Sequence, residues 1–279
     1  MEVLGIKYKS PEVTLLNHNG IGVSEVAARS CYDSFENSEH NAIKFFEPTT
    51  ADMDAINSIT SSDLLDDLAW TYFHHSILEH SSLSFFVKGT SRGVLQEHAR
   101  HRMQAISVRS TRYTMSGIIN AFVASKYDTN SKAWFTNKIL SFDMFVVDDN
   151  NYCLLEASQI FDKLNFQYNT IGEDEFTKTA IAKSSLIHLG RSAINADTVF
   201  EKLQAGKKKR NVGDAFKHIV SDNWKVDMVV TFNLRSLKNY FELRDSGAAY
   251  FQIQELAKQM KEVTPKSCLK LIDKKFKDE

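Results

Sequence analysis

The stretch Arg100-His101-Arg102-Met103-Gln104-Ala105-Ile106-Ser107-Val108-Arg109-Ser110-Thr111-Arg112-Tyr113 is the most informative part of this 279-residue chain. It holds four arginines, one histidine and, apart from the tyrosine, three hydroxyl side chains within fourteen residues. An arginine fork recognises phosphate or carboxylate through two parallel hydrogen bonds. So many guanidinium groups are costly to bury without an anion to neutralise them. The stretch therefore predicts a site for a phosphorylated ligand, and the alternative interpretation is a solvated charged face.

The spacing within this stretch resembles a signature of the flavin-dependent thymidylate synthases, in which Arg-His-Arg is followed by seven residues and then Ser. Asn233-Leu234-Arg235-Ser236-Leu237-Lys238-Asn239, with Arg244 beyond it, resembles the second signature of that family. His74-His75-Ser76-Ile77-Leu78-Glu79-His80 resembles its His-x-Thr/Ser-x-x-Glu-His turn, and the residues from Ala27 to Asp33 resemble its first helix. The resemblance covers roughly residues 20–115 and 214–260, which is more than half of the chain.

This resemblance implies an α/β chain of the α+β type, with a mainly antiparallel sheet flanked by helices. It also implies conversion of dUMP to dTMP, with 5,10-methylenetetrahydrofolate as the one-carbon donor and NADPH as the reductant through FAD. The family forms homotetramers whose active sites are built from several subunits. We therefore expect residues 1–279 to form a single catalytic domain, with a helical elaboration at about 116–212, where the resemblance fades.

The residues that match ligand contacts of the family fall into two groups. The positions that match dUMP contacts are Glu97, Arg100, Ser110, Thr111, Arg112, Lys217 and Arg244. The positions that match FAD contacts are His74, Ser76, Arg100, His101, Arg102, Asn233, Arg235 and Asn239. Arg244 also matches the catalytic residue assigned to ionising uracil N3, where a cation stabilises the developing negative charge. Two positions depart from the family, because Val108 replaces an acidic or polar residue of many members and Lys217 replaces the Arg of some members.

Composition sets broad limits on the class of protein. The 34 Lys and Arg residues nearly balance the 35 Asp and Glu residues, so no overall field favours nucleic acid or a membrane as a partner. The three cysteines Cys31, Cys153 and Cys268 are widely spaced, which fits a reducing compartment better than a disulfide scaffold. No signal peptide and no apolar run of about 18 residues is apparent. We therefore expect a cytoplasmic protein.

Hydrophobic spacing and capping residues predict the elements around the motifs. We expect strands at residues 3–8, followed by a loop, and at 83–88 and 225–232. We expect helices at 25–32, with Ser24 as the cap, from Ser61 or Ser62 onward, and after Ser91. Further helices are expected at 152–166, 173–188 and 214–220, through the second signature, and at 248–260. Residues 34–60 receive no assignment, and the Lys-rich tail from Lys266 is expected to be exposed.

Helical spacing also predicts which side chains act together. Glu97, Arg100 and His101 lie three and four residues apart, so they would share one face of a helix. At about 100° per residue, Arg235 and Asn239 stand about 40° apart, whereas Arg244 faces about 180° away from Arg235. This arithmetic favours one ligand for Arg235 and Asn239 and a different ligand for Arg244.

Several other interpretations remain open at this point. The three histidines of residues 74–80 could bind a metal, but a zinc site needs further ligands in firm geometry, so we predict no metal. Ser110 could be a nucleophile, but its neighbours are arginines and offer no base, so a phosphate-binding hydroxyl is favoured. The whole chain could instead be a flavin-dependent methylase acting on another uracil derivative. It could also be a nucleotide-binding or RNA-binding module that uses residues 100–112 and the basic run 207–210 without chemistry.

Overall fold

The structure is a computed structural model that describes residues 2–3, 6–7, 11–40, 42–110 and 225–277. The chain divides into two compact units. The first comprises residues 1–10, 89–95 and 108–227, and the second comprises residues 11–88, 96–107 and 228–279. The second unit holds β3, most of the other sheet strands and the cavity described below, so it is the part that bears on function.

Six strands, seven α-helices and three 3-10 helices make up the described part of the chain. The strands are β1 (Glu2–Val3), β2 (Ile6–Lys7), β3 (Glu12–His18), β4 (Ser82–Ser91), β5 (Gln104–Val108) and β6 (Lys225–Asn233). The α-helices are α1 (Gly22–Tyr32), α2 (Thr50–Asn57), α3 (Asp63–Trp70), α4 (Arg92–His98), α12 (Leu234–Arg244), α13 (Phe251–Val263) and α14 (Lys266–Ile272). The 3-10 helices are η1 (Phe35–Asn37), η2 (His75–Glu79) and η4 (Lys274–Phe276).

A four-stranded antiparallel sheet in the order β3-β4-β6-β5 forms the centre of the fold, which confirms the predicted fold class. Strand β4 alternates as its sequence predicts, with Leu83, Phe85 and Val87 fully buried. Burying each of these side chains contributes about 1.5–3 kcal/mol to stability. Strand β3 pairs antiparallel with β4, and the register shifts between Leu15 and Asn17.

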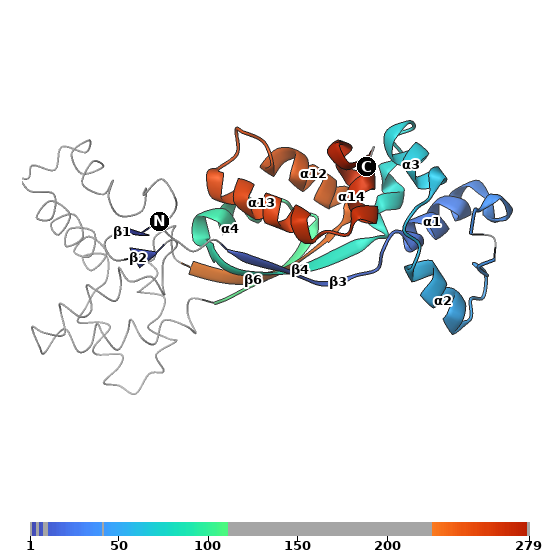
Figure 1. Ribbon diagram of the computed structural model, residues 1–279, viewed down its shortest axis with the longest axis horizontal. Helices are drawn as coiled ribbons and strands as arrows, with labels where there is room; N and C mark the ends of the chain where they lie inside the picture. The colour runs from blue at the N-terminus through green and yellow to red at the C-terminus, as the bar shows by residue number, and fades with distance from the viewer. Residues whose placement is uncertain (1, 4–5, 8–10, 41, 111–224, 278–279) are drawn as a thin grey trace, which may run out of the picture. The chain divides into compact units, whose positions relative to one another are not determined.

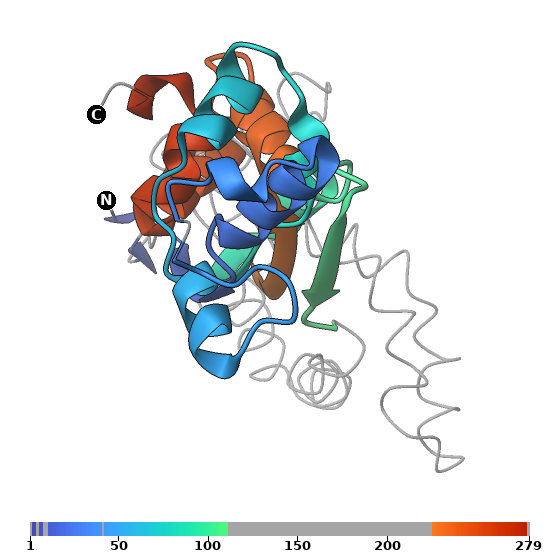
Figure 2. The ribbon, with the colours of Figure 1, turned by 90° about the vertical axis from the view of Figure 1, so that its right-hand side faces the viewer.

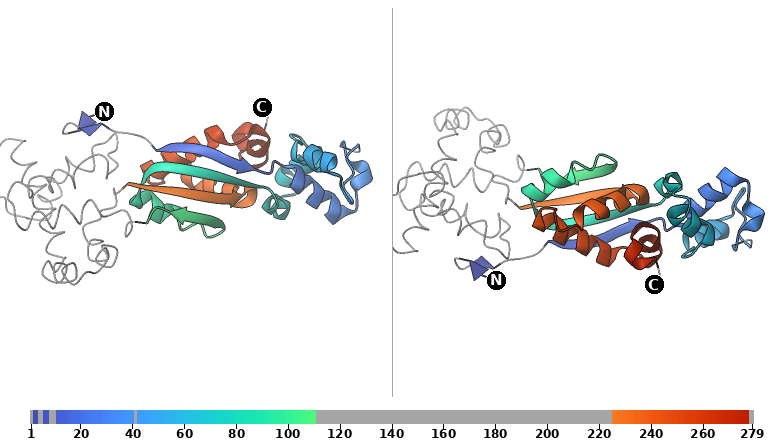
Figure 3. Two further views of the ribbon diagram at one scale, coloured as in Figure 1. Left: turned by 90° about the horizontal axis from the view of Figure 1, so that it is seen from below. Right: turned by 90° about the horizontal axis from the view of Figure 1, so that it is seen from above.

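Helices α12, α13 and α14 cover one face of this sheet, as Figures 1 and 3 show. Helix α13 packs against β3, and α12 contacts both α13 and α14. The left view of Figure 3 shows the opposite face, over which no helix of the described residues lies. The core between α12 and the sheet is formed by buried apolar residues of α12, which are Leu234, Leu237, Tyr240 and Phe241.

Helices α1, α2 and α3 gather at one end of the sheet (Figures 1 and 2). A buried ionic network joins them to their connecting segments. The fully buried carboxylate of Glu25 accepts a hydrogen bond from Arg29 Nε at 2.7 Å, another from Ser38 Oγ at 3.3 Å and a third from Ser62 Oγ. Ser62 also caps α3 by accepting a hydrogen bond from the backbone N–H of Leu65. One buried carboxylate therefore links α1, the segment after it and the start of α3.

Several predicted elements are confirmed with small shifts of their ends. Helix α3 begins after Ser62, one of the two predicted starting positions, and α4 begins after Ser91, whose Oγ accepts from Val94 N at 3.2 Å. Strand β6, helix α12 and helix α13 lie where the sequence predicts them. Within the unassigned region, α2 has a capping box formed by Thr49 and Asp52, a signal that the sequence carries.

The N-terminal segment differs from the predicted strand and loop. Two short strands, β1 and β2, pair antiparallel within residues 2–7, and the longer β3 occupies the predicted loop. The sequence of β3 does not alternate cleanly, because Leu15 and Leu16 are adjacent and Leu16 is exposed. Strand β5, within the first signature, was not predicted either.

Two further predictions are wrong. Helix α1 begins at Gly22 without a side-chain cap, and the Oγ of Ser24 lies 2.7 Å from the Oγ of Ser81 instead. The tail is not simply exposed, because α14 buries Cys268, Leu269, Leu271 and Ile272. Its lysines lie between apolar residues at helical spacing, so the lysine content concealed a buried helix face.

Other predictions concern residues outside the described part of the chain. These are the helices at 152–166, 173–188 and 214–220, the basic run 207–210 and the elaboration at about 116–212. They remain predictions, as does the single catalytic domain. None of the described helices combines the length and the apolar character that a membrane span requires.

Candidate active site

A cavity of about 1090 Å³ lies beside α12 in the second unit. This volume is slightly above the roughly 300–1,000 Å³ of most small-molecule sites. Seven of the predicted site residues line the cavity, namely Arg100, His101, Arg102, Asn233, Arg235, Asn239 and Arg244. The two signatures, more than a hundred residues apart in the sequence, therefore meet at one cavity.

Helix α12 delivers the second signature to this cavity. Asn233 is its N-cap, and the Oδ1 of Asn233 accepts a hydrogen bond from Ser236 N at 2.8 Å. Because one side of α12 is buried in the core, Arg235 and Asn239 are left on the exposed side. Arg244 is the last residue of the helix and is only 14% exposed.

The first signature reaches the cavity through a loop. Helix α4 ends at His98, so Arg100 and His101 do not share a helix face with Glu97 as predicted. A turn follows, in which His101 N donates to His98 O at 3.1 Å. Arg100 still pairs with Glu97, at 3.3 Å, although its side chain is 72% exposed.

The cavity wall carries an excess of positive charge. Among the described residues, four arginines (Arg100, Arg102, Arg235 and Arg244) and one carboxylate, that of Glu79, line it. Glu79 forms an ion pair with Arg235. Arg102 is exposed and has no hydrogen bond or ion pair within the described part of the chain. This donor set suits an anionic ligand with several phosphate oxygens.

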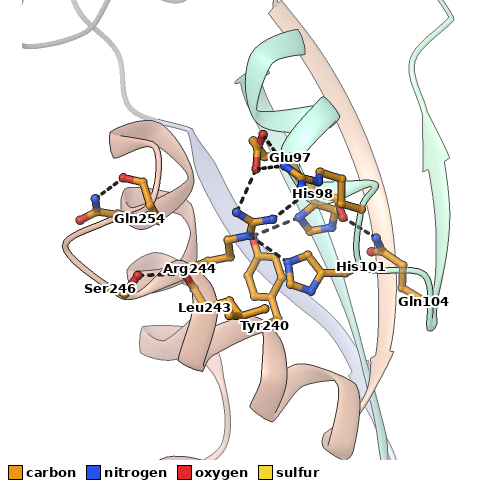
Figure 4. Close-up of polar contacts among 11 residues, drawn as sticks. Glu97, His98, His101, Gln104, Tyr240, Leu243, Arg244, Ser246 and Gln254 are labelled. Atoms are coloured by element: carbon orange, nitrogen blue, oxygen red, sulfur yellow. Dashed lines mark hydrogen bonds and ion pairs between the residues drawn. The ribbon is translucent and has the colours of Figure 1, made fainter.

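Arg244 is held by the end of α4 and the loop after it (Figure 4). Its Nη1 donates to Glu97 Oε2 at 2.9 Å, its Nη2 donates to the Glu97 carbonyl oxygen at 3.1 Å, and its Nε donates to His101 Nε2 at 2.9 Å. An imidazole nitrogen that accepts a hydrogen bond carries no proton, so His101 is neutral with its proton on Nδ1. Burial, together with the charges of Arg244 and Arg100, lowers the pKa of His101 to about 4, while Glu97 acts in the opposite direction.

Aromatic rings form the buried side of this cluster. The His101 ring packs edge-to-face on Tyr240, with 4.8 Å between centroids, and Tyr240 packs in turn on Phe232 and His98. The hydroxyl of Tyr240 lies 3.1 Å from His98 Nδ1. Burial, followed by the nearby His101, lowers the pKa of His98 to about 3, so His98 is neutral at physiological pH. The cavity is therefore supported by uncharged rings behind its arginines.

Ion pairs with α13 and with the segment after α14 also hold the C-terminal end of α12. Asp245, directly after Arg244, forms an ion pair with Lys261 at 2.6 Å, and Lys261 forms another with Asp273 at 2.6 Å. Burial alone would lower the pKa of Lys261, but the hydrogen bonds that it donates to both carboxylates raise it, so this lysine stays charged. The C-terminal end of α12 is thus anchored to α13 and to the segment after α14.

Of the histidine turn, only Glu79 lines this cavity, and the predicted contacts His74 and Ser76 do not. His74 is exposed, and its Nδ1 lies 2.6 Å from the Tyr32 hydroxyl. Ser76 is also exposed, and the Nε2 of His75 lies 3.0 Å from the Ala69 carbonyl oxygen. Within the described ranges no group of three or more His, Cys, Asp or Glu side chains is placed to hold a metal ion.

Two other predicted dUMP residues, Glu97 and Ser110, are not among the described residues that line the cavity. Ser110 is exposed and belongs to the first unit. Thr111, Arg112 and Lys217 lie outside the described residues. Sequence reasoning did not assign Glu79 to the site, although it stands within the quoted histidine turn. The other missed lining residues, Met103, Ser236, Leu243, Ser246, Ala248 and Ala249, carry no distinctive sequence signal.

Arg235 and Arg244 face opposite ways on α12, as the helical spacing predicts, but this does not place them at different cavities. Arg235, Asn239 and Arg244 all line the same cavity despite the 180° between Arg235 and Arg244. The long side chain of Arg244 extends toward α4, and the helix ends there, so the cavity wraps around the end of α12. One cavity therefore offers two differently placed groups of donors.

Comparison with known families and proteins gives a consistent picture. Residues 14–268 match the family described as thymidylate synthase complementing protein. A flavin-dependent thymidylate synthase of Campylobacter jejuni is 27% identical over 254 residues, covering 91% of this chain and 92% of the relative. A protein of the same name from Wolinella succinogenes is 26% identical over 260 residues, covering 91% and 93%.

Solved structures share the fold. The crystal structure of thymidylate synthase X from Helicobacter pylori with FAD and dUMP is similar to this chain with a TM-score of 0.53. The two are 22% identical, and the similarity covers 96% of this chain and 99% of the other. At this identity, the comparison supports the fold.

Proposed function

The chain belongs to the family of the thymidylate synthase complementing proteins, the flavin-dependent thymidylate synthases, and on that premise we propose that it converts dUMP to dTMP. In this proposal 5,10-methylenetetrahydrofolate donates the one-carbon unit and NADPH supplies the reducing equivalents through FAD. We further propose that the protein acts in the cytoplasm as a homotetramer with shared active sites. The enzyme class follows from the family, whereas the reductant, the folate and the assembly are parts of the proposal.

One observation supports this function above the others. The two signatures meet at a cavity whose described lining has four arginines and one carboxylate. Both FAD and dUMP carry phosphate groups, which arginine forks bind through paired charged hydrogen bonds. The residues present therefore fit both ligands by their chemistry.

The exposed basic and amide groups of the cavity suit the flavin cofactor. We assign Arg100, Arg102, Asn233, Arg235 and Asn239 to FAD, since Arg102 has no partner among the described residues and can bind a phosphate, and Asn239 presents an amide beside Arg235. FAD, when bound, supplies the redox chemistry, and the protein contributes binding and orientation. His74 and Ser76 lie outside this cavity, and we retain them as FAD contacts through the resemblance of their turn.

Arg244 suits the nucleotide. Its side chain is only 14% exposed and is held by three hydrogen bonds, and a positive charge in such a setting stabilises negative charge that develops on a uracil ring. Glu97 and Arg100 flank it. Ser110, Thr111, Arg112 and Lys217 remain proposed dUMP contacts.

The test is a direct assay of the purified protein. The protein should show flavin absorbance, and it should form dTMP only when dUMP, methylenetetrahydrofolate, FAD and NADPH are all present. Formation of a different methylated uracil derivative would favour a related methylase instead. Absence of flavin binding together with tight RNA binding would contradict the enzyme assignment.

A further inference from the structure

The guanidinium of Arg244 is fixed by three acceptors before any ligand arrives. Two of them belong to Glu97, and the third is the ring nitrogen Nε2 of His101 at 2.9 Å (Figure 4). An arginine has five N–H donors, so two remain for a ligand. Because the three acceptors lie on two different edges of the guanidinium, they fix the plane of the group as well as its position.

His101 is unusual among these acceptors. Histidine is a common donor and a common metal ligand, but here it accepts a hydrogen bond from a cation, which only its neutral form can do. The residue is only 8% exposed, and its ring packs on Tyr240, which is fully buried. Tyr240 is itself fixed by its contact with His98. The acceptor nitrogen of His101 is therefore held in one place by the core.

We propose that His101 is a positioning residue for Arg244, whose orientation toward the nucleotide depends on the acceptor nitrogen Nε2 of His101. This inference rests on the proposed function, in which Arg244 contacts dUMP. It gives the His101 side chain a role in nucleotide binding that is separate from the flavin contact implied by the family resemblance. Glu97 alone would anchor the two terminal nitrogens of Arg244 and leave its part-buried Nε–H without a partner.

Two substitutions separate the acceptor from the bulk of the ring. His101→Gln can place a carbonyl oxygen near the position of Nε2, whereas His101→Leu keeps a similar size and removes the acceptor. We expect His101→Leu to weaken dUMP binding about tenfold or more, as for loss of a hydrogen bond to a charged group. His101→Gln should recover most of this loss. The measurement is the Kd of dUMP for the FAD-loaded protein by equilibrium dialysis, with the Kd of FAD by fluorescence and thermal unfolding measured alongside.

A double-mutant cycle with Arg244→Lys tests whether His101 acts through Arg244. Lysine has no Nε–H in a planar fork, so it cannot use the His101 acceptor in the same way. In the Arg244→Lys background, His101→Leu should change the Kd of dUMP by less than about twofold, because the two residues act as one unit. Any effect of His101→Leu on the Kd of FAD should be the same in both backgrounds.

Each outcome decides between separate claims. Additive losses of dUMP affinity, or a failure of His101→Gln to improve on His101→Leu, would overturn the positioning role while leaving the proposed function intact. A wild-type protein that binds FAD but neither binds dUMP nor forms dTMP would overturn the proposed function, and this inference with it. If His101→Leu does not fold, His101→Asn replaces it, since its shorter side chain cannot bring an oxygen to the Nε2 position.

Discussion

Arg244 differs from the other arginines of the cavity in how much of its geometry the protein sets in advance. Its side chain is 14% exposed and makes hydrogen bonds through three nitrogens, whereas that of Arg100 is 72% exposed and makes a single ion pair at 3.3 Å. A preorganised cation in a partly dry site stabilises developing charge more than a mobile surface cation does. Position 244 therefore allows the effects of charge and of fork geometry to be measured separately.

We predict that Arg244→Ala retains FAD but loses dUMP affinity by about 30-fold or more, which corresponds to roughly 2–5 kcal/mol for a buried charged hydrogen bond. Arg244→Lys should recover part of the binding because the charge remains, but less of the turnover because the planar fork is lost. The measurement is a dUMP titration of the flavin spectrum, with dTMP formation assayed in parallel. Lys258→Ala, an exposed change on α13 outside the cavity, is the control. Wild-type dUMP affinity in Arg244→Ala would exclude this residue from the nucleotide site.

A second prediction about single residues concerns the buried ion pair between Glu25 and Arg29. Arg29→Ala should leave the fully buried Glu25 carboxylate without its cation, and breaking a buried pair in this way costs about 3–5 kcal/mol. Lys88→Ala breaks the exposed pair with Glu12, and this control should cost less than about 1 kcal/mol. Denaturant unfolding of the two variants measures both free energies. Equal losses would mean that the buried network has no special weight.

Helix α12 is the element that organises the site, because its buried side packs on the core while its exposed side and its C-terminal end meet the cavity. Exchanging both Arg235 and Asn239 for Ala should weaken FAD binding at least about tenfold and weaken dUMP binding much less. Glu242→Ala, an exposed change on the same helix, controls for helix stability. Fluorescence titration with FAD and dialysis with dUMP give the two affinities. Equal loss of both ligands from a folded double variant would argue against the assignment of Arg235 and Asn239 to the flavin.

The contact between α1 and α2 depends on a glycine. A Cβ built on Gly22 would lie 1.8 Å from the carbonyl oxygen of Ile56, so Gly22→Ala must push the two helices apart. We expect a loss of about 1–3 kcal/mol or more in the free energy of unfolding. Gly247→Ala is the matched control, since its Cβ would meet nothing within 4 Å. Chemical denaturation of both variants tests the prediction, and an unchanged midpoint for Gly22→Ala would show that α2 moves freely.

Elements with strong local signals were predictable from the sequence. The Ser62 cap, the alternation of Leu83, Phe85 and Val87, and the N-cap of α12 are local patterns, and the structure has each of them. Elements defined by distant partners were not predictable. Strand β3 exists because β4 pairs with it, and Ser24 meets Ser81 across 57 residues of sequence, so neither position is specified by its neighbours.

In the candidate site too, local sequence signals were predictable and contacts between distant segments were not. The signatures identify Arg235 and Arg244, but the acceptor role of His101 and the ion pair between Glu79 and Arg235 arise from chain segments that meet only in the fold. Helical spacing places Arg235 and Arg244 on opposite faces of the helix. It does not show that both line one cavity, because it ignores the length of an arginine side chain and the end of the helix. A cavity that wraps around a helix end cannot be seen in a helical projection.

At the scale of the whole molecule, the two cysteines in the described part of the chain offer little for covalent catalysis. Cys268 is buried in α14, and burial raises the pKa of its thiol to about 11, so it stays protonated and unreactive at neutral pH. Cys31 is exposed near the end of α1 and is not part of the cavity wall. Cys153 lies outside the described residues. In the proposed function the positive charge of Arg244, and not a thiolate, activates uracil.

This reasoning predicts that dTMP formation survives the removal of every cysteine. A triple variant with Ala at positions 31, 153 and 268 should retain turnover within about tenfold of wild type. Any loss should reflect a packing defect at Cys268, because truncating a buried side chain lowers stability and does not remove a reacting group. The single variant Cys268→Ala isolates that packing defect, and its thermal unfolding should account for any loss in the triple variant. Turnover of the FAD-loaded proteins is the measurement, with flavin content confirming that each variant is folded and loaded. Complete loss of turnover in a folded, flavin-loaded triple variant, with Cys268→Ala still active, would assign the chemistry to Cys31 or Cys153 and remove the need for Arg244 as the activating group.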